Sequence, residues 1–319
     1  FKDRVLMEGD PFAVIESMTV AAFATGCVHG WLYLRGEYPR CLAVLEAAID
    51  AARHRGFLGA DVMGAGFAFD VTIVRGGGAY ICGEETAIFN SIEGYRGEPR
   101  NKPPFPVEVG LFGLPTVVNN VETMVNVLPI LRDGSAAFTA RGSDGSTGTK
   151  LFCLSGAVER PGVYEVEFGV TLGELIELAG GLRSGSELRA VLLGGAAGTF
   201  VGPDALDLPL TMEGARERGA TLGSGVVLVL DDSVDLVDQV QRIAAFFRDE
   251  SCGQCVPCRV GTVRQAEAVA RLAAGKGGDD DLAVFNDLAT VMRDASICGL
   301  GQTAPNAIQS AIERFGLFS

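Results

Sequence analysis

Four cysteines towards the C-terminal end of the chain have the residue type and spacing of a redox cofactor site. Cys252, Cys255 and Cys258 form a C-x2-C-x2-C run, and Cys298 follows 40 residues after it. Three thiolates at this spacing can each bind a different iron of a [4Fe–4S] cubane, and a distant fourth cysteine completes the ligand set. Gly253, inside the run, has no Cβ to obstruct a cluster. The spacing therefore favours an iron–sulfur cluster.

Two other interpretations of these cysteines stay open. Structural zinc also accepts four cysteines, but zinc sites usually pair two separate C-x2-C knuckles, and the chain has a single run. A disulfide within the run needs an oxidising compartment, which no other feature indicates. The remaining cysteines lie in apolar surroundings and are expected to be buried free thiols in a reducing cytoplasm; they are Cys27, Cys41, Cys82 and Cys153.

A glycine-rich stretch, residues 75–86, is the second candidate for chemistry. It follows an expected strand, ends in Glu84 and Glu85, and leads into an expected helix. A glycine turn between strand and helix lets a phosphorylated or planar ligand touch the backbone. Adjacent carboxylates at a helix start can equally be complements to the helix dipole. The glycines of residues 63–66 precede a strand, so they do not fit a dinucleotide fingerprint.

Elements that could position the first site alternate between helix and strand. Asp10 and Pro11 open a helix that stops at Gly26. Strand 28–34, helix 40–55 and strand 67–74 follow, and this order predicts an α/β domain with a largely parallel sheet. A short strand at 116–118 leads into a helix reaching Leu131. His29 and His54 are expected to be structural.

Beyond the linker 142–148 the pattern changes twice. A hairpin of strands 150–158 and 163–168, a helix opened by the capping box Thr171-x-x-Glu174, and strands 190–193 and 226–230 predict a small ubiquitin-like α+β unit. Helices 236–248, 260–274, 282–293 and 304–315 then predict a bundle around the cysteines. Asp280 and Asp281 are expected to be solvated charges in a loop.

Composition limits the partners. The 319 residues include 40 acidic and 26 basic side chains, for a formal charge of −14. Such a field disfavours nucleic acid and anionic membrane surfaces. No apolar run is long enough to span a membrane, so direct membrane insertion is not expected. Because the chain begins with Phe1 rather than Met, we expect it to be a fragment whose first domain lacks its N-terminal part.

Three motifs together carry a family resemblance: residues 78–87, residues 101–106, and the cysteine run with Ser296-Ile297-Cys298. Their combination closely resembles the flavin-bearing, NADH-binding subunit of respiratory complex I. Related diaphorase subunits occur in NAD-reducing hydrogenases and NAD-dependent formate dehydrogenases. The resemblance covers essentially the whole chain. It implies an α/β FMN/NADH-binding domain at 1–141, a β-grasp domain at 149–232 and a helical bundle with a [4Fe–4S] cluster at 233–319.

The resemblance also assigns roles to individual residues. It implies FMN contacts at Gly83, Glu84, Asn119, Asn120 and Thr123, an NADH pocket at Tyr80, Glu85, Lys102 and Phe105, and cluster ligation by Cys252, Cys255, Cys258 and Cys298. The family's flavin-phosphate loop would lie upstream of Phe1. No general acid or base is required, because FMN takes the hydride from NADH and passes electrons on singly.

The implied function is an NADH:acceptor oxidoreductase (diaphorase) subunit of a larger complex, with FMN, a [4Fe–4S] cluster and NADH or NAD. Expected partners are a small thioredoxin-like [2Fe–2S] subunit and a larger iron–sulfur subunit, with a lean towards a soluble formate dehydrogenase or hydrogenase. The expected location is the cytoplasm or the periphery of a membrane complex. The alternative is a non-catalytic iron–sulfur relay or docking subunit without flavin, which a flavin absorbance spectrum would distinguish.

Overall fold

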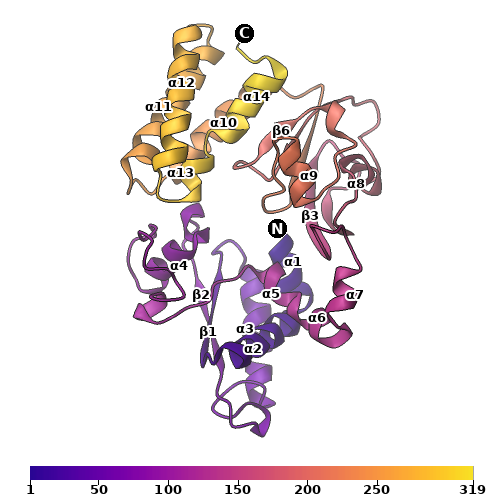
Figure 1. Ribbon diagram of the computed structural model, residues 1–319, viewed down its shortest axis with the longest axis vertical. Coiled ribbons are helices and arrows are strands. Elements are labelled where there is room, and N and C mark those ends of the chain that lie inside the picture. Colours follow the sequence, from indigo (N-terminus) through magenta and orange to yellow (C-terminus); the bar gives the residue numbers. More distant parts are fainter. Residues whose placement is uncertain (319) are drawn as a thin grey trace. The chain divides into compact units, whose positions relative to one another are not determined.

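The computed structural model describes residues 1–318, which fold into two compact units (Figure 1). The first unit comprises Phe1–Gly97 and Lys102–Ala140. The second comprises Glu98–Asn101 and the residues from Arg141 onward. Among the described residues, no helix combines the length and the apolarity needed to cross a membrane.

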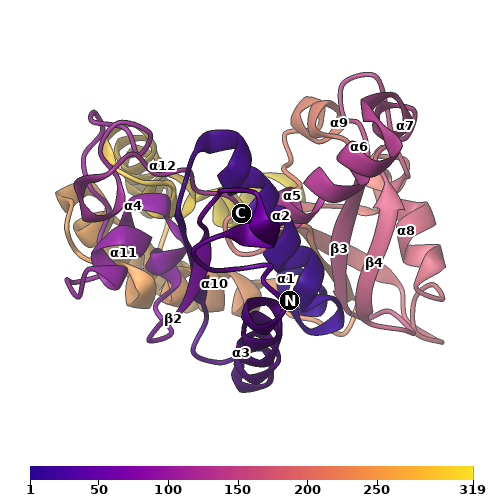
Figure 2. The ribbon, with the colours of Figure 1, turned by 90° about the horizontal axis from the view of Figure 1, so that it is seen from below.

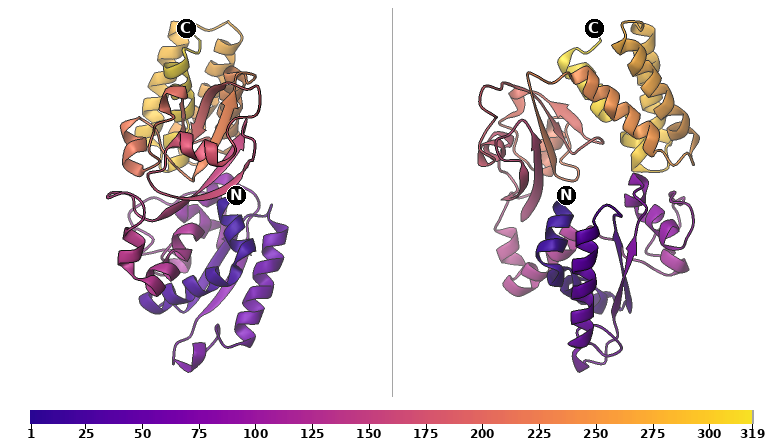
Figure 3. Two further views of the ribbon diagram at one scale, coloured as in Figure 1. Left: turned by 90° about the vertical axis from the view of Figure 1, so that its right-hand side faces the viewer. Right: turned by 180° about the vertical axis from the view of Figure 1, so that it is seen from behind.

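The first unit is built on a parallel pair of strands with helices beside it. Its first elements are α1 (Lys2–Gly9), α2 (Pro11–Thr25), β1 (His29–Leu34), α3 (Pro39–His54) and β2 (Asp70–Arg75). β1 and β2 pair in parallel, with His29 opposite Asp70. α2 contacts β1 and α3 contacts β2, and the right-hand view of Figure 3 shows α3 alongside the strands. The predicted parallel pairing is confirmed, since a parallel pair requires such a crossover.

Local sequence explains where α2 begins and ends. The Asp10 side chain accepts a hydrogen bond from the Ala13 N–H at 3.0 Å, and Pro11 occupies the first helical position. Gly26 ends the helix with φ +73°, a left-handed conformation that glycine adopts without steric cost. Both predicted ends are therefore confirmed.

The rest of the first unit is made of short elements. They are η2 (Tyr80–Gly83), α4 (Glu85–Ile92), η3 (Leu111–Gly113), α5 (Val121–Val125), α6 (Val127–Asp133) and α7 (Ser135–Thr139). The single helix expected up to Leu131 is wrong, because the structure breaks it at Asn126. Pro129 explains the break: it has no N–H to give to the carbonyl of Val125, and its ring would clash there.

The second unit begins with a five-stranded sheet. Its elements are β3 (Thr149–Gly156), β4 (Gly162–Glu167), α8 (Leu172–Leu178), β5 (Leu188–Leu193), β6 (Thr199–Val201), α9 (Met212–Glu217) and β7 (Val226–Asp231). The strand order is β4-β3-β7-β5-β6, in which only β3 and β7 are parallel. The predicted hairpin is confirmed, whereas β6 was not predicted.

Helix α8 covers this sheet (Figure 2). Thr171 and Glu174 form the predicted capping box: the Glu174 N–H donates to Thr171 Oγ1 at 3.2 Å, and the Thr171 N–H donates to Glu174 Oε2 at 2.8 Å. The apolar side of the helix joins one buried cluster with the sheet, which includes Leu172, Leu175, Ile176, Phe152, Val191 and Val229.

Helices make up the remainder of the second unit. They are α10 (Leu236–Glu250), α11 (Val256–Ala273), α12 (Asp279–Ala295), α13 (Gly299–Thr303) and α14 (Asn306–Phe315). α11 contacts both α10 and α12, and α14 contacts α10 and β6. α11 begins four residues earlier than predicted, at Val256, because Pro257 is tolerated in a first helical turn. Cys258 is therefore helical.

Two expectations about single side chains are wrong. Asp280 and Asp281 belong to the first turn of α12, where acidic residues suit the helix dipole, and Asp281 accepts a hydrogen bond from Arg271 Nε at 2.9 Å. Cys27 is half-buried rather than buried, while Cys41, Cys82 and Cys153 are buried as expected. All eight cysteines are free thiols.

Candidate functional site

A group of two carboxylates and one lysine forms at the start of α4. Glu84 is the N-cap, and its Oε2 accepts hydrogen bonds from the N–H groups of Thr86 and Ala87, both at 2.9 Å. Lys102 Nζ donates to the other oxygen of Glu84 at 3.1 Å and also to Glu85. The structure therefore brings together three of the residues that the family resemblance implies.

The protonation of this group is set by its contacts. Burial alone would raise the pKa of Glu84, but hydrogen bonds from Thr86, Ala87 and Lys102 together hold it below the ordinary value. Burial would lower the pKa of Lys102, and the bonds to Glu85 and Glu84 raise it instead. At neutral pH the group therefore holds two negative charges and one positive charge.

The glycine turn before this group lies tightly against the end of β1. A Cβ on Gly76 would stand 2.6 Å from the Tyr33 hydroxyl, and one on Gly36 would stand 2.5 Å from the Gly76 carbonyl oxygen. Real Cβ atoms do not approach so closely, so both positions require glycine. Tyr33 is fixed in turn by a hydroxyl contact of 2.9 Å with Ser91 Oγ on α4. The turn, β1 and α4 are thus locked together at the carboxyl ends of the parallel strands, where α/β proteins bind ligands.

A second polar group forms where α5 begins. Asn120 is the N-cap of α5 and accepts a hydrogen bond from the Glu122 N–H at 3.0 Å. Lys2, which is only 6% exposed, donates to Asn120 Oδ1 at 2.8 Å. Its ammonium also pairs with Asp3 at 2.7 Å and with Glu122 at 2.8 Å. Asn120 itself is exposed, so a buried cation supports an amide that faces solvent.

The other implied residues of the first unit are exposed. Phe105 is 52% and Tyr80 45% exposed, and Gly83, Asn119 and Thr123 are also exposed. The Phe105 N–H donates to Glu108 Oε2 at 3.0 Å, and the Thr116 N–H donates to the Pro106 carbonyl at 2.8 Å. These bonds fix the backbone of the proline-rich loop and leave the aromatic ring free to contact a ligand.

The three cysteines of the run and Cys298 lie in one neighbourhood. Burial raises the pKa of the Cys258 thiol to about 11, the bond from Ser251 lowers it, and the nearby thiols of Cys255, Cys298 and Cys252 raise it further. Cys258 and Cys298 are buried, whereas Cys252 and Cys255 are half-buried. Ser251 Oγ lies 3.2 Å from Cys258 Sγ and accepts a hydrogen bond from the Gly253 N–H at 3.3 Å, which fixes the loop.

The arrangement suits a cluster better than a single metal ion. Over residues 1–318, no three His, Cys, Asp or Glu side chains converge as they would around one ion. The four thiols nevertheless act electrostatically on one another. In a cubane each thiolate binds a different iron, so the sulfur ligands stand farther apart than around one ion.

A buried hydroxyl beside the cysteines points the same way. Ser296 Oγ, two residues before Cys298, has no hydrogen-bond partner within the described part of the chain. An unpaired buried hydroxyl costs about 1–3 kcal/mol, which a sulfur acceptor would offset. The donor set therefore fits a [4Fe–4S] cluster.

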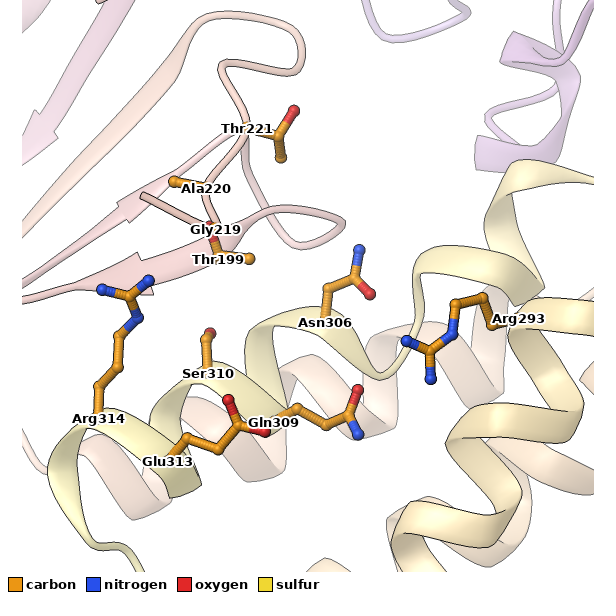
Figure 4. A pocket seen from close by; sticks show the side chains of 10 residues that line it. All are labelled: Thr199, Gly219, Ala220, Thr221, Arg293, Asn306, Gln309, Ser310, Glu313 and Arg314. Atoms are coloured by element: carbon orange, nitrogen blue, oxygen red, sulfur yellow. The ribbon is translucent and has the colours of Figure 1, made fainter. Parts of the chain in front are cut away.

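A separate open cavity of about 450 Å³ lies in the second unit (Figure 4). Its lining holds none of the predicted site residues and consists of Thr199, Gly219, Ala220, Thr221, Arg293, Asn306, Gln309, Ser310, Glu313 and Arg314. Several polar groups there already have protein partners: Arg314 donates to the Arg218 carbonyl, and Gln309 donates to Asn286 Oδ1 at 3.2 Å. We therefore assign the cavity no ligand.

Sequence reasoning missed three residues of these groups. Lys2 carries no motif, and only its position between acidic partners from two segments identifies it. Ser251 and Ser296 both lie within the cysteine motifs but were given no role. A hydroxyl one residue before Cys252, or two before Cys298, was the available signal, because side-chain donors close to metal-binding thiolates commonly hydrogen-bond to them.

Family models match three successive parts of the chain. The model described as the Nuo51 FMN-binding domain matches residues 1–129, and an SLBB domain matches residues 151–199. The model described as the NADH-ubiquinone oxidoreductase-F iron-sulfur binding region matches residues 238–317. The chain therefore contains an FMN-binding domain and a 4Fe-4S region of this family, which includes every site residue that the resemblance implied.

Whole-chain relatives agree with these matches. The chain is 41% identical to the hydrogenase protein HndC of Solidesulfovibrio fructosivorans, part of an NADP-reducing hydrogenase, over 99% of its length and 64% of that protein. It is 43% identical to a second F-type component of NADH-quinone oxidoreductase from Rhizobium meliloti (strain 1021), over 99% of its length and 75% of that protein.

A solved structure gives the same answer. A crystal structure of NAD+-reducing [NiFe]-hydrogenase in the H2-reduced state superposes with a TM-score of 0.90 and 41% identity, covering 100% of this chain and 53% of that one. The chain thus spans between half and three quarters of these proteins. With this extent of identity, it belongs to the NADH-quinone oxidoreductase-F family of FMN-binding, iron–sulfur proteins.

Proposed function

We propose that the chain is the NADH:acceptor oxidoreductase module of a multisubunit complex. The first unit would hold FMN and NADH, and the second would hold a [4Fe–4S] cluster that delivers electrons to partner subunits. The observation that carries this proposal is the joint presence of the Glu84–Lys102–Glu85 group, in an FMN-binding domain, and four mutually interacting thiols in one chain.

The proposed chemistry requires no proton relay from the protein. When bound, FMN exchanges a hydride for single electrons, which suits a cubane that carries one. Glu84 and Asn120 would contact the flavin, together with Gly83, Asn119 and Thr123. Lys102 would hold Glu84 and Glu85 in place and offset their charge, so that an anionic nucleotide is not repelled.

NADH would bind beside this group. The exposed rings of Phe105 and Tyr80 offer flat surfaces for stacking a base or a nicotinamide. Glu85, whose side chain is 41% exposed, has a free face from which to accept a hydrogen bond from a ribose hydroxyl. Cys252, Cys255, Cys258 and Cys298 would hold the cubane, each on a different iron.

We further propose three domains, at residues 1–141, 149–232 and 233–319. The middle one would be a β-grasp fold, which is supported by the order β4-β3-β7-β5-β6 and by α8 on one face of the sheet. The last would be a helical bundle, supported by the contacts of α11 with α10 and α12. Eight free thiols support a reducing compartment such as the cytoplasm.

The proposed partners are a thioredoxin-like [2Fe–2S] subunit and a larger iron–sulfur subunit. The names of the hydrogenase relatives support the lean towards a hydrogenase-type assembly. The alternative, a relay subunit without flavin, is not favoured, since residues 1–129 match an FMN-binding domain.

A flavin spectrum and two carboxylate variants of the full-length protein test the proposal. Purified wild type should show flavin absorbance and reduce ferricyanide with NADH. Glu84→Gln should lower flavin occupancy, whereas Glu85→Gln should raise the KM for NADH at unchanged flavin content. Glu46→Gln, an exposed carboxylate on α3, is the control and should change neither. Iron without flavin or NADH oxidation would instead support the relay alternative.

A further inference from the structure

Ser296 lies at the junction between α12 and α13, two residues before Cys298. Its backbone is fixed on both sides: the Ser296 N–H donates to the Met292 carbonyl at 3.1 Å, and Gln302 Nε2 donates to the Ser296 carbonyl at 2.9 Å. With both backbone groups paired, the position of the side chain is determined by the helices around it. Of its polar groups, the hydroxyl has no partner among residues 1–318.

That hydroxyl is directed towards the cysteines. Ser296 is 5% exposed. A Cβ built on Gly301 would clash with Ser296 Oγ and would lie 2.9 Å from Cys258 Cβ. The hydroxyl and the third cysteine of the run therefore border the same small space, which stays open because residue 301 is glycine.

Other donors surround the same sulfur atoms. The backbone N–H groups of Leu300 and Gly301 interact with the Cys298 thiol, and Ser251 Oγ contacts Cys258 Sγ at 3.2 Å. Ser296 would complete this ring of donors. Gln265 Nε2 is also buried without a partner in the described chain, but it lies seven residues beyond Cys258 on α11. Burial alone therefore does not single out Ser296; its place beside the cysteines does.

We propose that the Ser296 hydroxyl donates a hydrogen bond to a sulfur atom of the bound cluster and raises its reduction potential. This inference rests on the proposed function, because it requires the four cysteines to hold a [4Fe–4S] cluster. A cluster gains one negative charge on reduction, and a donor aimed at its sulfur stabilises the more negative state. Ser296 is thus a tuning residue that acts on the cluster and not on NADH or FMN.

A redox titration of the full-length holoprotein, followed by the EPR signal of the reduced cluster, tests this directly. In Ser296→Ala, the ratio of reduced to oxidised cluster at a fixed ambient potential should fall about threefold to tenfold, equivalent to a decrease of about 30–60 mV for one electron. Ser296→Thr, which keeps the hydroxyl, should titrate like wild type. Iron content should be unchanged in both variants.

A matched control separates tuning from packing. Ser310→Ala removes an equally buried hydroxyl of the second unit, one that accepts a hydrogen bond from the Phe200 N–H at 2.9 Å. It should change stability and leave the potential unchanged. Pulsed EPR after exchange into D2O gives an independent readout: the wild type should show an exchangeable proton coupled to the cluster, and Ser296→Ala should lack that coupling.

The outcomes distinguish this inference from the proposed function. A wild type with no EPR-active cluster would overturn the proposed function itself. A wild-type cluster whose potential and exchangeable proton coupling both survive Ser296→Ala would overturn only the role of Ser296. If Ser296→Ala failed to fold, the wild-type proton coupling compared with that of Ser296→Thr would still decide: no such coupling in either protein would contradict the hydrogen bond.

Discussion

Two lysines of the first unit, Lys2 and Lys102, each bring together acidic groups from separate segments. Lys102 joins the carboxylates at the start of α4, and Lys2 joins α1 to the start of α5. Family resemblance led to Lys102, because that residue lies in a recognisable motif. It could not lead to Lys2, whose role depends on a contact across 118 positions in sequence that only folding creates.

Removing the buried cation tests the role of Lys2. Lys2→Met should lower the free energy of unfolding by up to about 3 kcal/mol, because it leaves Asp3 and Glu122 without their partner in a poorly hydrated place. It should also weaken flavin binding through Asn120. Thermal unfolding and flavin retention measure the two effects. Arg40→Met, which removes an 80% exposed cation paired with Glu8 at 3.6 Å, should cost less than about 1 kcal/mol. Equal losses in the two variants would contradict this account.

Phe105 gives a second prediction for a single residue. Because its ring is exposed on a loop held by backbone hydrogen bonds, Phe105→Ala should remove stacking worth about 1–3 kcal/mol and raise the KM for NADH about fivefold to 150-fold. Flavin content should not change. Phe112→Ala, which removes a comparably exposed ring of the same unit, should leave the KM unaltered. Loss of FMN at a constant KM would reverse the assignment of Phe105.

Helix ends were the least predictable feature among the elements. The start of α2 and the capping box of α8 were predictable because each depends on residues within one turn. The start of α11 and the break at Asn126 were missed because proline has opposite effects in a first turn and in a helix interior. The start of α12 was missed because a run of acids suits both a solvated loop and a helix N-terminus.

The cap of α4 predicts a pH dependence. Since the pKa of Glu84 is lower in the folded protein than its ordinary value of 4.5, its contribution to stability is complete above that pH and is lost as the pH falls through the lower folded value. Glu84→Gln should therefore cost about 0.5–2 kcal/mol at pH 7. Chemical denaturation at a series of pH values should show this difference shrinking below pH 4.5. A difference that stays constant down to about pH 3 would mean that the carboxylate charge is not involved.

At the scale of the whole molecule, the sequence motifs were most informative where they combine. Neither the glycine turn nor Glu84 and Glu85 alone distinguishes a ligand site from a capped helix, and the cysteine run alone leaves zinc open. Their presence in one chain pointed to the family that the comparisons then showed. The interior of the second unit was less predictable: β6 has only three residues, and its Phe200 N–H donates to Ser310, 110 positions away.

Electron routing gives the prediction at this scale. In the full-length protein, Cys255→Ala should remove the cluster and leave NADH oxidation by ferricyanide largely intact, because a small acceptor can take electrons from FMN. Reduction of the physiological partner should stop. Steady-state assays with the two acceptors make the comparison, and Cys153→Ala, a buried thiol in β3, serves as the cysteine control. If partner reduction survived in Cys255→Ala, the cluster would be structural.

The parallel pairing of β3 with β7 has a consequence for synthesis on the ribosome. Gly156 ends β3, and Val226, which begins β7, emerges 70 residues later. At about 5–20 residues per second, roughly 4–14 s pass before β3 gains its second neighbour. Throughout that interval β3 is covered on one edge by β4, while its other edge exposes unpaired N–H and C=O groups. The nascent second unit therefore carries an edge that another chain could join, and its safe completion depends on how soon β7 leaves the exit tunnel.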